Sequence, residues 1–556
     1  MDSARCWFLR GCVCVFVLTS VFGCSGATRS DEEFFDVVVL GGTSGGVAAA
    51  VQAARMGKSV VLIESSEHLG GLTSGGLGAT DIGNKKAIGG IAREFYHRVY
   101  LHYLKGDSWI FEKRRDYRKT GEHRSGAESW DREKAWWMFE PHVAEAIFEE
   151  MTRQAKVTVV YGERLDLKGG VQKEGSRIVA IKAESGRIFR GKMFIDATYE
   201  GDLMAGAGVS YTVGRESNSQ YGETLNGVQT KNARYHQFEK PVDPYVRLGE
   251  PSSGLLAGVH GDGPGIEGEG DHRVQAYCFR MCLTDAEENR VAFAKPKDYD
   301  EQRYELLLRY YEAGYDDIPW LPHMMPNRKT DTNNKHGFST DNIGMNYDYP
   351  DADYATRERI ITEHASYQKG LMWTLANHPR IPMHIREQVS RWGLAQDEFI
   401  DNGNWPHQLY VREARRMVSD YVMTEQNCRY QRVASDSVGL GAYGMDSHNT
   451  QRYVDSHGHA RNEGDVQVAV AGPYPISYRS IIPKVGECMN LLVPVCVSST
   501  HIAFGSIRME PVFMVLGQSA ATTACLAMEE GVGVQDLDYQ RLRKQLLRDG
   551  QILKWK

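Results

Sequence analysis

The sequence predicts an α/β fold in which a parallel sheet, flanked by helices, carries a large inserted α+β domain. A continuous apolar run at residues 35–40 is typical of a strand buried on both faces of a parallel sheet. A glycine-rich turn and a helix of small residues follow directly, and a second apolar run at residues 58–64 ends in an acid. Strand-like segments recur near residues 192–197 and 490–495. One sheet is therefore predicted to draw on distant parts of the chain.

Length and composition are those of a globular protein with more than one domain. The chain has 556 residues, and 65 Lys+Arg against 72 Asp+Glu leave a formal net charge of −7. The chain lacks the positive excess with which nucleic-acid binders displace counterions, so no nucleic-acid partner is predicted. Its 42% hydrophobic and 25% charged residues argue against disorder and against a membrane-embedded fold.

Residues 1–24 are predicted to be an export signal. Two arginines flank an apolar run at residues 11–22 that is too short to cross a bilayer as a mature helix. The run ends in Val-Phe-Gly-Cys at residues 21–24, which resembles the lipobox of bacterial lipoproteins, where the cysteine is lipidated. Cleavage near Ala27 is the alternative. Either interpretation predicts an extracytoplasmic protein, in the periplasm or at the cell surface. In the lipoprotein interpretation, the protein contacts a membrane only through a lipid on Cys24.

The first strand, turn, helix and second strand match the pattern of a Rossmann-like dinucleotide-binding unit. Glycines allow the tight turn and the close approach of a diphosphate, whose charge the helix N-terminus stabilises, and an acid 23 positions after the first glycine binds the ribose. Thr43 departs from G-x-G-x-x-G at its second glycine. The predicted binding residues are Gly41, Gly42, Thr43, Ser44, Gly45, Gly46 and Glu64.

Three further segments point to a flavin cofactor. A second glycine-rich stretch directly after Glu64 resembles the Gly-Gly segment of FAD-binding proteins of the glutathione-reductase type. The returning strand near residue 197 resembles their second FAD contact. Near the C-terminus, a helix with proline in its first turn presents an N-terminus that stabilises the negative charge of reduced flavin. The predicted FAD-binding residues here are Gly70, Gly71, Leu72, Ala197, Thr198 and Glu510.

These segments divide the chain into domains. Residues 34–208 are predicted to form the first part of the FAD-binding domain and residues 481–556 its C-terminal part. Residues 209–480 would form the inserted domain, which supplies substrate contacts. Within it, residues 299–315 and 357–377 look helical, and a further helix is expected at Arg412–Arg416.

From Phe35 to its end, the chain resembles a bacterial family of commonly exported FAD-dependent oxidoreductases. Besides the FAD segments, the resemblance rests on residues 325–331, 405–416 and 473–480. It implies an enzyme with flavin redox chemistry and leaves the substrate and the electron acceptor open. Some similar proteins are labelled as relatives of the flavin subunit of heterodisulfide reductase, but this chain has no C-x₂-C-x₂-C run for an iron–sulfur cluster. Cys278 and Cys282 are interpreted as core residues or at most a structural disulfide.

Four residues are candidates for catalysis. His501, before the last long helix, is the first choice as base, with a structural role against the flavin as the alternative. Arg508 is expected to face the flavin or a substrate carboxylate. The alternative is that it is a surface residue that pairs with Glu510 at the start of the helix. His448 and Arg479, just upstream of the third FAD segment, rank second. The pattern His457-Gly458-His459 lacks a third ligand at useful spacing, so no metal is predicted.

The leading functional hypothesis is that the protein oxidises a small polar molecule by hydride transfer to flavin N5, and a carbohydrate-like alcohol is the suggested substrate. A flavin reductase or monooxygenase using an external donor is one alternative, although no second G-x-G-x-x-G is present. The other is a non-catalytic surface glycan-binding protein that retains the fold. Thr43 is the only residue that supports that second alternative.

Overall fold

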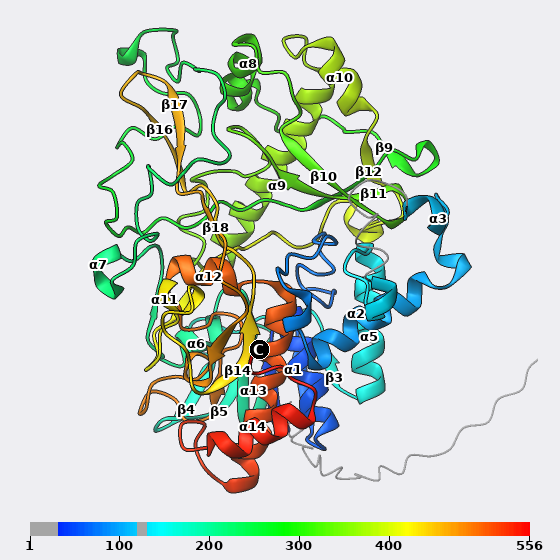
Figure 1. The fold of residues 1–556 in the computed structure, drawn as a ribbon, viewed down its shortest axis with the longest axis vertical. Coiled ribbons are helices and arrows are strands. Elements are labelled where there is room, and N and C mark those ends of the chain that lie inside the picture. The colour runs from blue at the N-terminus through cyan, green and yellow to red at the C-terminus, as the bar shows by residue number, and fades with distance from the viewer. Residues whose placement is uncertain (1–31, 119–129, 556) are drawn as a thin grey trace, which may run out of the picture.

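The computed structural model describes residues 32–118 and 130–555; the predicted signal peptide 1–24, with Cys24, lies outside them. Two lobes are visible in Figure 1. The first and last parts of the chain, blue to cyan and orange to red, share the lower lobe, whereas the green middle part builds most of the upper lobe. The lower lobe is therefore discontinuous in sequence.

A seven-stranded sheet organises the lower lobe. Its central strands run in the order β3-β2-β1-β6 and are all parallel. The first half of β6 also pairs antiparallel with β5, and its second half pairs parallel with β20. The strands are β1 (Glu32–Leu40), β2 (Val60–Ile63), β3 (Thr158–Val160), β4 (Val171–Glu174), β5 (Arg177–Lys182), β6 (Ile188–Asp196) and β20 (Leu491–Leu492).

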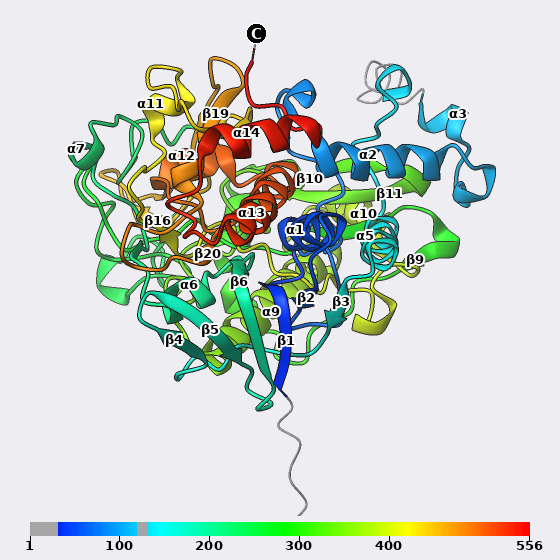
Figure 2. The same ribbon diagram turned by 90° about the horizontal axis from the view of Figure 1, so that it is seen from below.

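Two helices of small residues lie side by side on one face of this sheet, α1 (Ser44–Arg55) and α13 (Glu510–Glu530) (Figure 2). A Cβ on Gly517 would lie 2.0 Å from the carbonyl oxygen of Gly45, so this close packing requires glycine. By length and composition α13 resembles a membrane span, but 94% of its apolar window is buried, as in a core helix. The other helices of this lobe are α2 (Gly90–Tyr103), α3 (Arg114–Tyr117), α5 (Pro141–Ala155), α6 (Asp202–Gly206), α12 (His501–Ile507) and α14 (Tyr539–Arg548).

The upper lobe is built on a five-stranded antiparallel sheet in the order β10-β11-β8-β12-β9. The long helix α9 (Tyr354–Asn377) contributes Leu371 and Leu375 to its core, beside Trp320. The other elements here are α7 (Asn218–Tyr221), β8 (Met281–Thr284), β9 (Arg290–Val291), α8 (Glu305–Glu312), β10 (Trp320–Met325), β11 (Lys329–Asn334), α10 (Met383–Ser390) and β12 (Gly393–Ala395).

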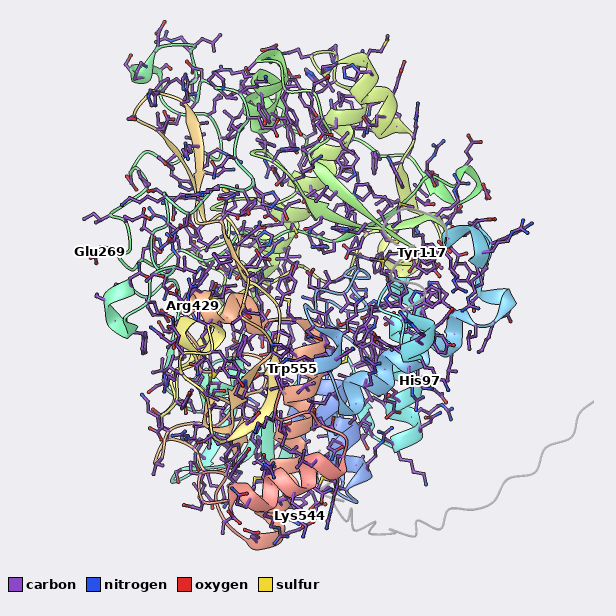
Figure 3. The ribbon with its side chains drawn as sticks, in the orientation of Figure 1. His97, Tyr117, Glu269, Arg429, Lys544 and Trp555 are labelled. Carbon is purple, nitrogen blue, oxygen red and sulfur yellow. The ribbon has the colours of Figure 1, made fainter. Side chains whose placement is uncertain are left out.

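Short elements after residue 415 return the chain to the lower lobe. Residues such as Met423, Val438 and Ile476 pack into the same core as α1 and α13, and Trp555 packs beside Leu440 (Figure 3). Of these elements, β13 (Arg416–Met417) pairs with the earlier strand β7 (Tyr211–Thr212), and α11 (Glu425–Cys428), β14 (Ser437–Gly441), β15 (Met445–Ser447) and β19 (Tyr474–Ser477) follow. Between β15 and β19, the hairpin of β16 (Gln451–Val454) and β17 (Ala460–Glu463) extends into the upper lobe (Figure 1), and β18 (Val466–Val468) pairs with β15 on the way back.

The expected helix at Arg412–Arg416 is wrong: these residues are buried, Arg416 begins β13, and the residues before it lie in no helix or strand. Each of the three arginines pairs with a different acid. Arg412 pairs with Asp341, Arg415 with Asp202, and Arg416 with Glu216. Buried guanidinium groups must be paired, and this requirement overrides the helix propensity of the sequence.

Candidate active site

Three distant segments meet at the N-terminus of α1. The Thr43 hydroxyl donates to the carbonyl of Ala197 at 2.8 Å and accepts from the Gly46 N–H at 3.2 Å. The N–H of Gly70 donates to the carbonyl of Gly42 at 2.7 Å. The first glycine turn, the second glycine stretch and the returning strand β6 therefore surround one helix N-terminus, as the cofactor prediction requires.

The glycine pattern has direct steric causes. Gly41 has φ +97°, which favours glycine, and a Cβ on Gly46 would lie 1.9 Å from the Gly41 carbonyl oxygen. Thr43, in contrast, has φ −62° and ψ 170°, an extended conformation open to any residue, and its side chain caps α1. Threonine is therefore compatible with this turn, which removes the one observation that favoured a protein without chemistry.

The turn offers donors suited to a diphosphate. Among the described residues, the backbone N–H groups of Thr43 and Gly45 have no hydrogen-bond acceptor, and both lie at the N-terminus of α1. Glu64 follows β2 and accepts from the Gly42 N–H at 2.6 Å. Free N–H groups at a helix N-terminus, beside an acid that can bind ribose hydroxyls, fit the diphosphate and ribose of a dinucleotide.

Glu510, the first residue of α13, links all these segments. Its buried carboxylate accepts from the hydroxyls of Ser44 at 2.5 Å, Thr73 at 2.8 Å and Tyr199 at 2.8 Å. Burial raises the pKa of Glu510. The Tyr199 hydroxyl in turn accepts from the Leu72 N–H at 2.9 Å. Thr73 and Tyr199 were not predicted, although each directly follows a predicted cofactor residue in the sequence.

A pocket of ≈490 Å³ with polar and apolar side chains in its lining lies between the lobes. The residues around β15 and β18 form one side, including Asp446 and His448, and His236, Asn333 and Asn334 of the upper lobe form the other. Asp446 is the only acid among the described lining residues, and no Lys or Arg side chain lines the pocket. The pocket therefore presents hydrogen-bonding groups that suit a small, hydroxyl-bearing molecule.

His448 is the titratable group in this pocket with a defined geometry. Its Nδ1 lies 2.8 Å from Asp341 Oδ2, and Asp341 Oδ1 lies 2.9 Å from Arg412 Nη2. Burial and the charge of Arg412 lower the pKa of His448 to about 4, so the ring is neutral near pH 7. Burial opposes ionisation of Asp341, but Arg412 and His448 overcome it and hold its pKa below the usual range. The neutral ring therefore donates from Nδ1 and keeps a lone pair on Nε2.

Arg508 lies in the turn between α12 and α13 and is buried. Its Nη1 donates to the hydroxyl of Tyr410 at 2.6 Å, and its Nη2 donates to the carbonyl of Asp446 at 3.2 Å. It does not pair with Glu510, whose carboxylate is engaged by three hydroxyls. Arg508 thus joins the start of the cofactor helix to the wall of the pocket.

The other two predicted catalytic residues lie outside the pocket. His501 begins α12 instead of lying in a loop, and both of its ring nitrogens are engaged, Nδ1 with Glu413 at 2.7 Å and Nε2 with Ser447 at 2.9 Å. Burial lowers its pKa to about 3. Arg479 is 45% exposed and pairs with Asp436 at 2.9 Å. Asp341 was missed, because nothing in the sequence links it to a histidine 107 positions away.

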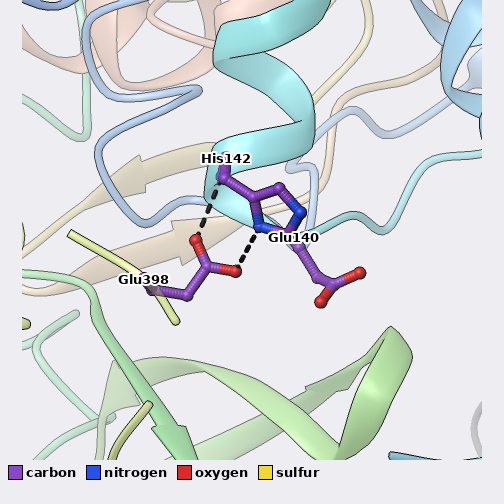
Figure 4. Close-up of side chains that lie close together, drawn as sticks. All are labelled: Glu140, His142 and Glu398. Carbon is purple, nitrogen blue, oxygen red and sulfur yellow. Dashed lines mark hydrogen bonds and ion pairs between the residues drawn. The ribbon is translucent and has the colours of Figure 1, made fainter. Parts of the chain in front are cut away.

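One cluster resembles a metal site. Glu140 and His142 at the start of α5 lie beside Glu398 (Figure 4). The Nζ of Lys329, however, lies 2.8 Å from Glu140 and 2.6 Å from Glu398. Its ammonium group supplies the positive charge that these buried carboxylates need, so they form an ion-pair cluster between the lobes. The six described cysteines, including Cys278 and Cys282, are buried and free.

Several solved structures share a part of the fold, at less than two thirds of their own length, and no curated protein matches the sequence. L-amino acid deaminase from Proteus vulgaris is 14% identical, over 33% of this chain and 53% of that one, with a TM-score of 0.23. L-proline dehydrogenase from P. horikoshii is 16% identical, over 34% of this chain and 59% of that one, with a TM-score of 0.22. 3-Ketosteroid-Δ4-(5α)-dehydrogenase from Rhodococcus jostii RHA1 is 19% identical, over 33% of this chain and 50% of that one, with a TM-score of 0.19.

The family comparison covers nearly the whole described chain. Residues 36–546 match the family described as FAD dependent oxidoreductase. The match includes both halves of the lower lobe and the inserted upper lobe, and it indicates FAD as the cofactor. The chain belongs to the family of FAD-dependent oxidoreductases.

Proposed function

We propose that this FAD-dependent oxidoreductase oxidises a small, carbohydrate-like alcohol in the ≈490 Å³ pocket, with His448 as the base. The observation that carries the proposal is the His448–Asp341 pair, which leaves one ring nitrogen free beside a pocket lined by hydroxyl-binding groups. A base must be unprotonated and within reach of the substrate hydroxyl. His448 meets the first condition near neutral pH, because its pKa is lowered.

Each residue has a separate role in the proposed oxidation. When bound, FAD would supply the acceptor for the hydride that leaves the carbinol carbon. His448 Nε2 takes the hydroxyl proton, so that the substrate loses two electrons and two hydrogens and becomes a carbonyl compound. Asp341 keeps Nδ1 protonated and stabilises the imidazolium that forms. Asp446, 3.9 Å from His448 Nε2, can accept a hydrogen bond from a neighbouring hydroxyl of the substrate.

Arg508 connects the two sites. It contacts the Asp446 carbonyl and directly precedes the helix whose first acid lies in the cofactor cradle. We infer that it holds the pocket wall against the flavin and adds positive charge near the ring as negative charge develops there. Ser44, Thr73 and Glu510 would hold and orient the ribityl and phosphate part of the cofactor.

Anaerobic bleaching tests the proposal. The purified protein with bound FAD is mixed, without oxygen, with panels of aldoses, polyols, hydroxy acids and primary amines, and its absorbance near 450 nm is followed. We expect bleaching by a neutral polyol or sugar and none by hydroxy acids, because no cation lines the pocket. Bleaching by amines or hydroxy acids alone would contradict the substrate class, and rapid reduction by NADH would favour the reductase or monooxygenase alternative.

For its location, we propose export and lipidation at Cys24. The support is the basic and apolar composition of residues 1–24 and the lipobox-like ending. Expression with radiolabelled palmitate should label the wild-type protein and leave Cys24→Ser unlabelled. Export of an unlabelled wild-type protein would favour ordinary cleavage near Ala27.

A further inference from the structure

His236 lines the pocket between the lobes with a backbone conformation that is unusual for histidine. Its φ is +50°, in the left-handed region that favours glycine, and no other described residue of the lining has a positive φ. Its carbonyl accepts from the buried side-chain amides of Asn462 at 2.8 Å and Asn449 at 3.4 Å. Asn449 directly follows His448, so the segment that carries the proposed base also holds His236 in place. Strained backbone that the surrounding structure maintains is concentrated at functional sites.

The imidazole ring of His236 takes no part in this anchoring. Neither ring nitrogen makes a hydrogen bond to a described residue: Nδ1 is buried without a partner, and Nε2 lies 3.9 Å from Asp465 Oδ2, beyond hydrogen-bond distance. Glycine would place the same carbonyl without backbone strain. The fold therefore explains the carbonyl of His236 but not its ring, and Nε2 is the nitrogen that a ligand in the pocket can reach.

The rings of His236 and His448 are nearly parallel, with planes 7° apart and centroids 6.5 Å apart, but their surroundings differ. His448 has Asp341 2.8 Å from its Nδ1, whereas the one described carboxylate within 4 Å of the His236 ring belongs to Asp465. Burial and the nearby Asp446 raise the pKa of Asp465 well above its usual range, which favours the neutral acid. His236 thus lacks the charged carboxylate that stabilises an imidazolium, so it is suited to hydrogen bonding and not to proton abstraction.

We propose that His236 binds a second hydroxyl group of the substrate while His448 deprotonates the first, and that it thereby restricts the enzyme to polyhydroxylated substrates. Burial lowers the pKa of His236, so the ring is neutral near pH 7 and Nε2 can exchange a hydrogen bond with a hydroxyl group. An alcohol with a single hydroxyl would leave this nitrogen without a partner in a partly desolvated wall, which weakens binding. The inference rests on the proposed function, because it concerns the same pocket and the same substrate class.

Deoxy derivatives test the inference because each lacks one hydroxyl. The probes are the aldose or polyol of the panel that bleaches the flavin fastest, called the parent, and its monodeoxy derivatives. Anaerobic stopped-flow absorbance gives the dissociation constant and the limiting rate of flavin reduction for each compound. In the wild type, we expect one derivative to bind about tenfold more weakly than the parent and to keep a similar limiting rate. In His236→Phe, the parent should bind about tenfold more weakly and this derivative as in wild type, so that the two become nearly equal.

Two further variants control for the backbone strain at this position. His336→Phe places phenylalanine at another histidine with a positive φ, +63°, that does not line the pocket, so it should bind every compound as the wild type does. His236→Gly removes the ring but adopts φ +50° without strain, so it should reproduce the binding pattern of His236→Phe. If His236→Phe does not fold, His236→Gly takes its place.

Three results would overturn the inference alone. The first is a wild type that binds every monodeoxy derivative as tightly as the parent. The second is a folded His236→Gly that binds the parent within about twofold of the wild-type affinity. The third is an equal loss of affinity for the parent and all its derivatives, which would indicate a general change of the pocket. If no aldose or polyol bleaches the flavin, the proposed function itself fails, and the inference fails with it.

Discussion

Two buried histidine–carboxylate pairs lie near the end of β15, and they differ in the partner of the second ring nitrogen. His448 Nδ1 lies 2.8 Å from Asp341, and His501 Nδ1 lies 2.7 Å from Glu413. The second nitrogen of His501 accepts from Ser447, whereas His448 lines the pocket. We call the His501 pair closed, because both ring nitrogens have hydrogen-bond partners, and the His448 pair open, because its second nitrogen is beside the pocket. Access to the pocket, and not the pairing, is the difference between the two histidines, and it is why we propose His448 as the base.

The closed pair also supports the open one. Ser447 and His448 are consecutive, so a bond to one holds the backbone of the other. Gln275 donates to Glu413 at 2.7 Å and accepts from the His448 N–H at 3.1 Å. His501 therefore acts through its neighbours, and we expect it to be a positioning residue. The four predictions below test this difference.

The largest effect is expected for the open histidine. His448→Gln removes the base but keeps a polar side chain, so FAD content should stay normal while flavin reduction by the substrate slows about 10²- to 10⁴-fold. Anaerobic stopped-flow absorbance measures the rate. His457→Gln, at an exposed histidine, is the control. A reduction rate within about threefold of wild type would remove His448 as the base.

The pH dependence should separate the open pair from an ordinary histidine. Burial lowers the pKa of His448 to about 4, and only the neutral ring accepts a proton, so the rate of flavin reduction should be constant from pH 8 to about 6 and fall below about pH 5. An unperturbed histidine would lose activity near its ordinary pKa of about 6.5. An acid limb at that higher value would show that the ring is not desolvated as the geometry requires.

Loss of the closed histidine should affect stability more than chemistry. His501→Gln removes one hydrogen-bond partner each from Glu413, which keeps Gln275 and Arg416, and from Ser447, and we expect this loss to lower the free energy of unfolding by about 1–3 kcal/mol. Flavin reduction should slow far less than in His448→Gln. Denaturant unfolding and stopped-flow kinetics on the same preparation measure both. Normal stability with a rate loss as large as that of His448→Gln would instead make His501 the base, as the sequence alone predicted.

The smallest effect is expected at Arg479, which lies in neither pair. Its side chain is 45% exposed and its ion pair with Asp436 is near the surface, where such pairs contribute about 0–1 kcal/mol. Arg479→Gln should therefore leave the midpoint of unfolding and the rate of flavin reduction nearly unchanged. A large loss of rate with intact stability would place Arg479 in the catalytic machinery.

The cofactor half of the site was largely predictable because its residues are set by local rules. Gly41 needs a positive φ, Gly46 needs a close approach of the backbone, and Glu64 directly follows a strand. Each of these features can be recognised from a few neighbouring residues in the sequence. The convergence with Ala197 and Glu510 followed from their similarity to known FAD contacts. The substrate half was not predictable in this way, because Asp341 and His448 are separated by 107 positions and no local pattern joins them.

By itself, then, the sequence determined the α/β class, the dinucleotide-binding turn, FAD as the expected cofactor and the discontinuous lower lobe, since each depends on short-range periodicity, glycine sterics or strand-end chemistry. The tertiary structure alone decided that Arg412–Arg416 is not helical, that both ring nitrogens of His501 are engaged while His448 lines the pocket, and that α9 and Gly41 line one cavity. These features depend on which buried charges meet across the lobes. Pairing a buried charge constrains residues that are far apart in the chain, and no local pattern records it.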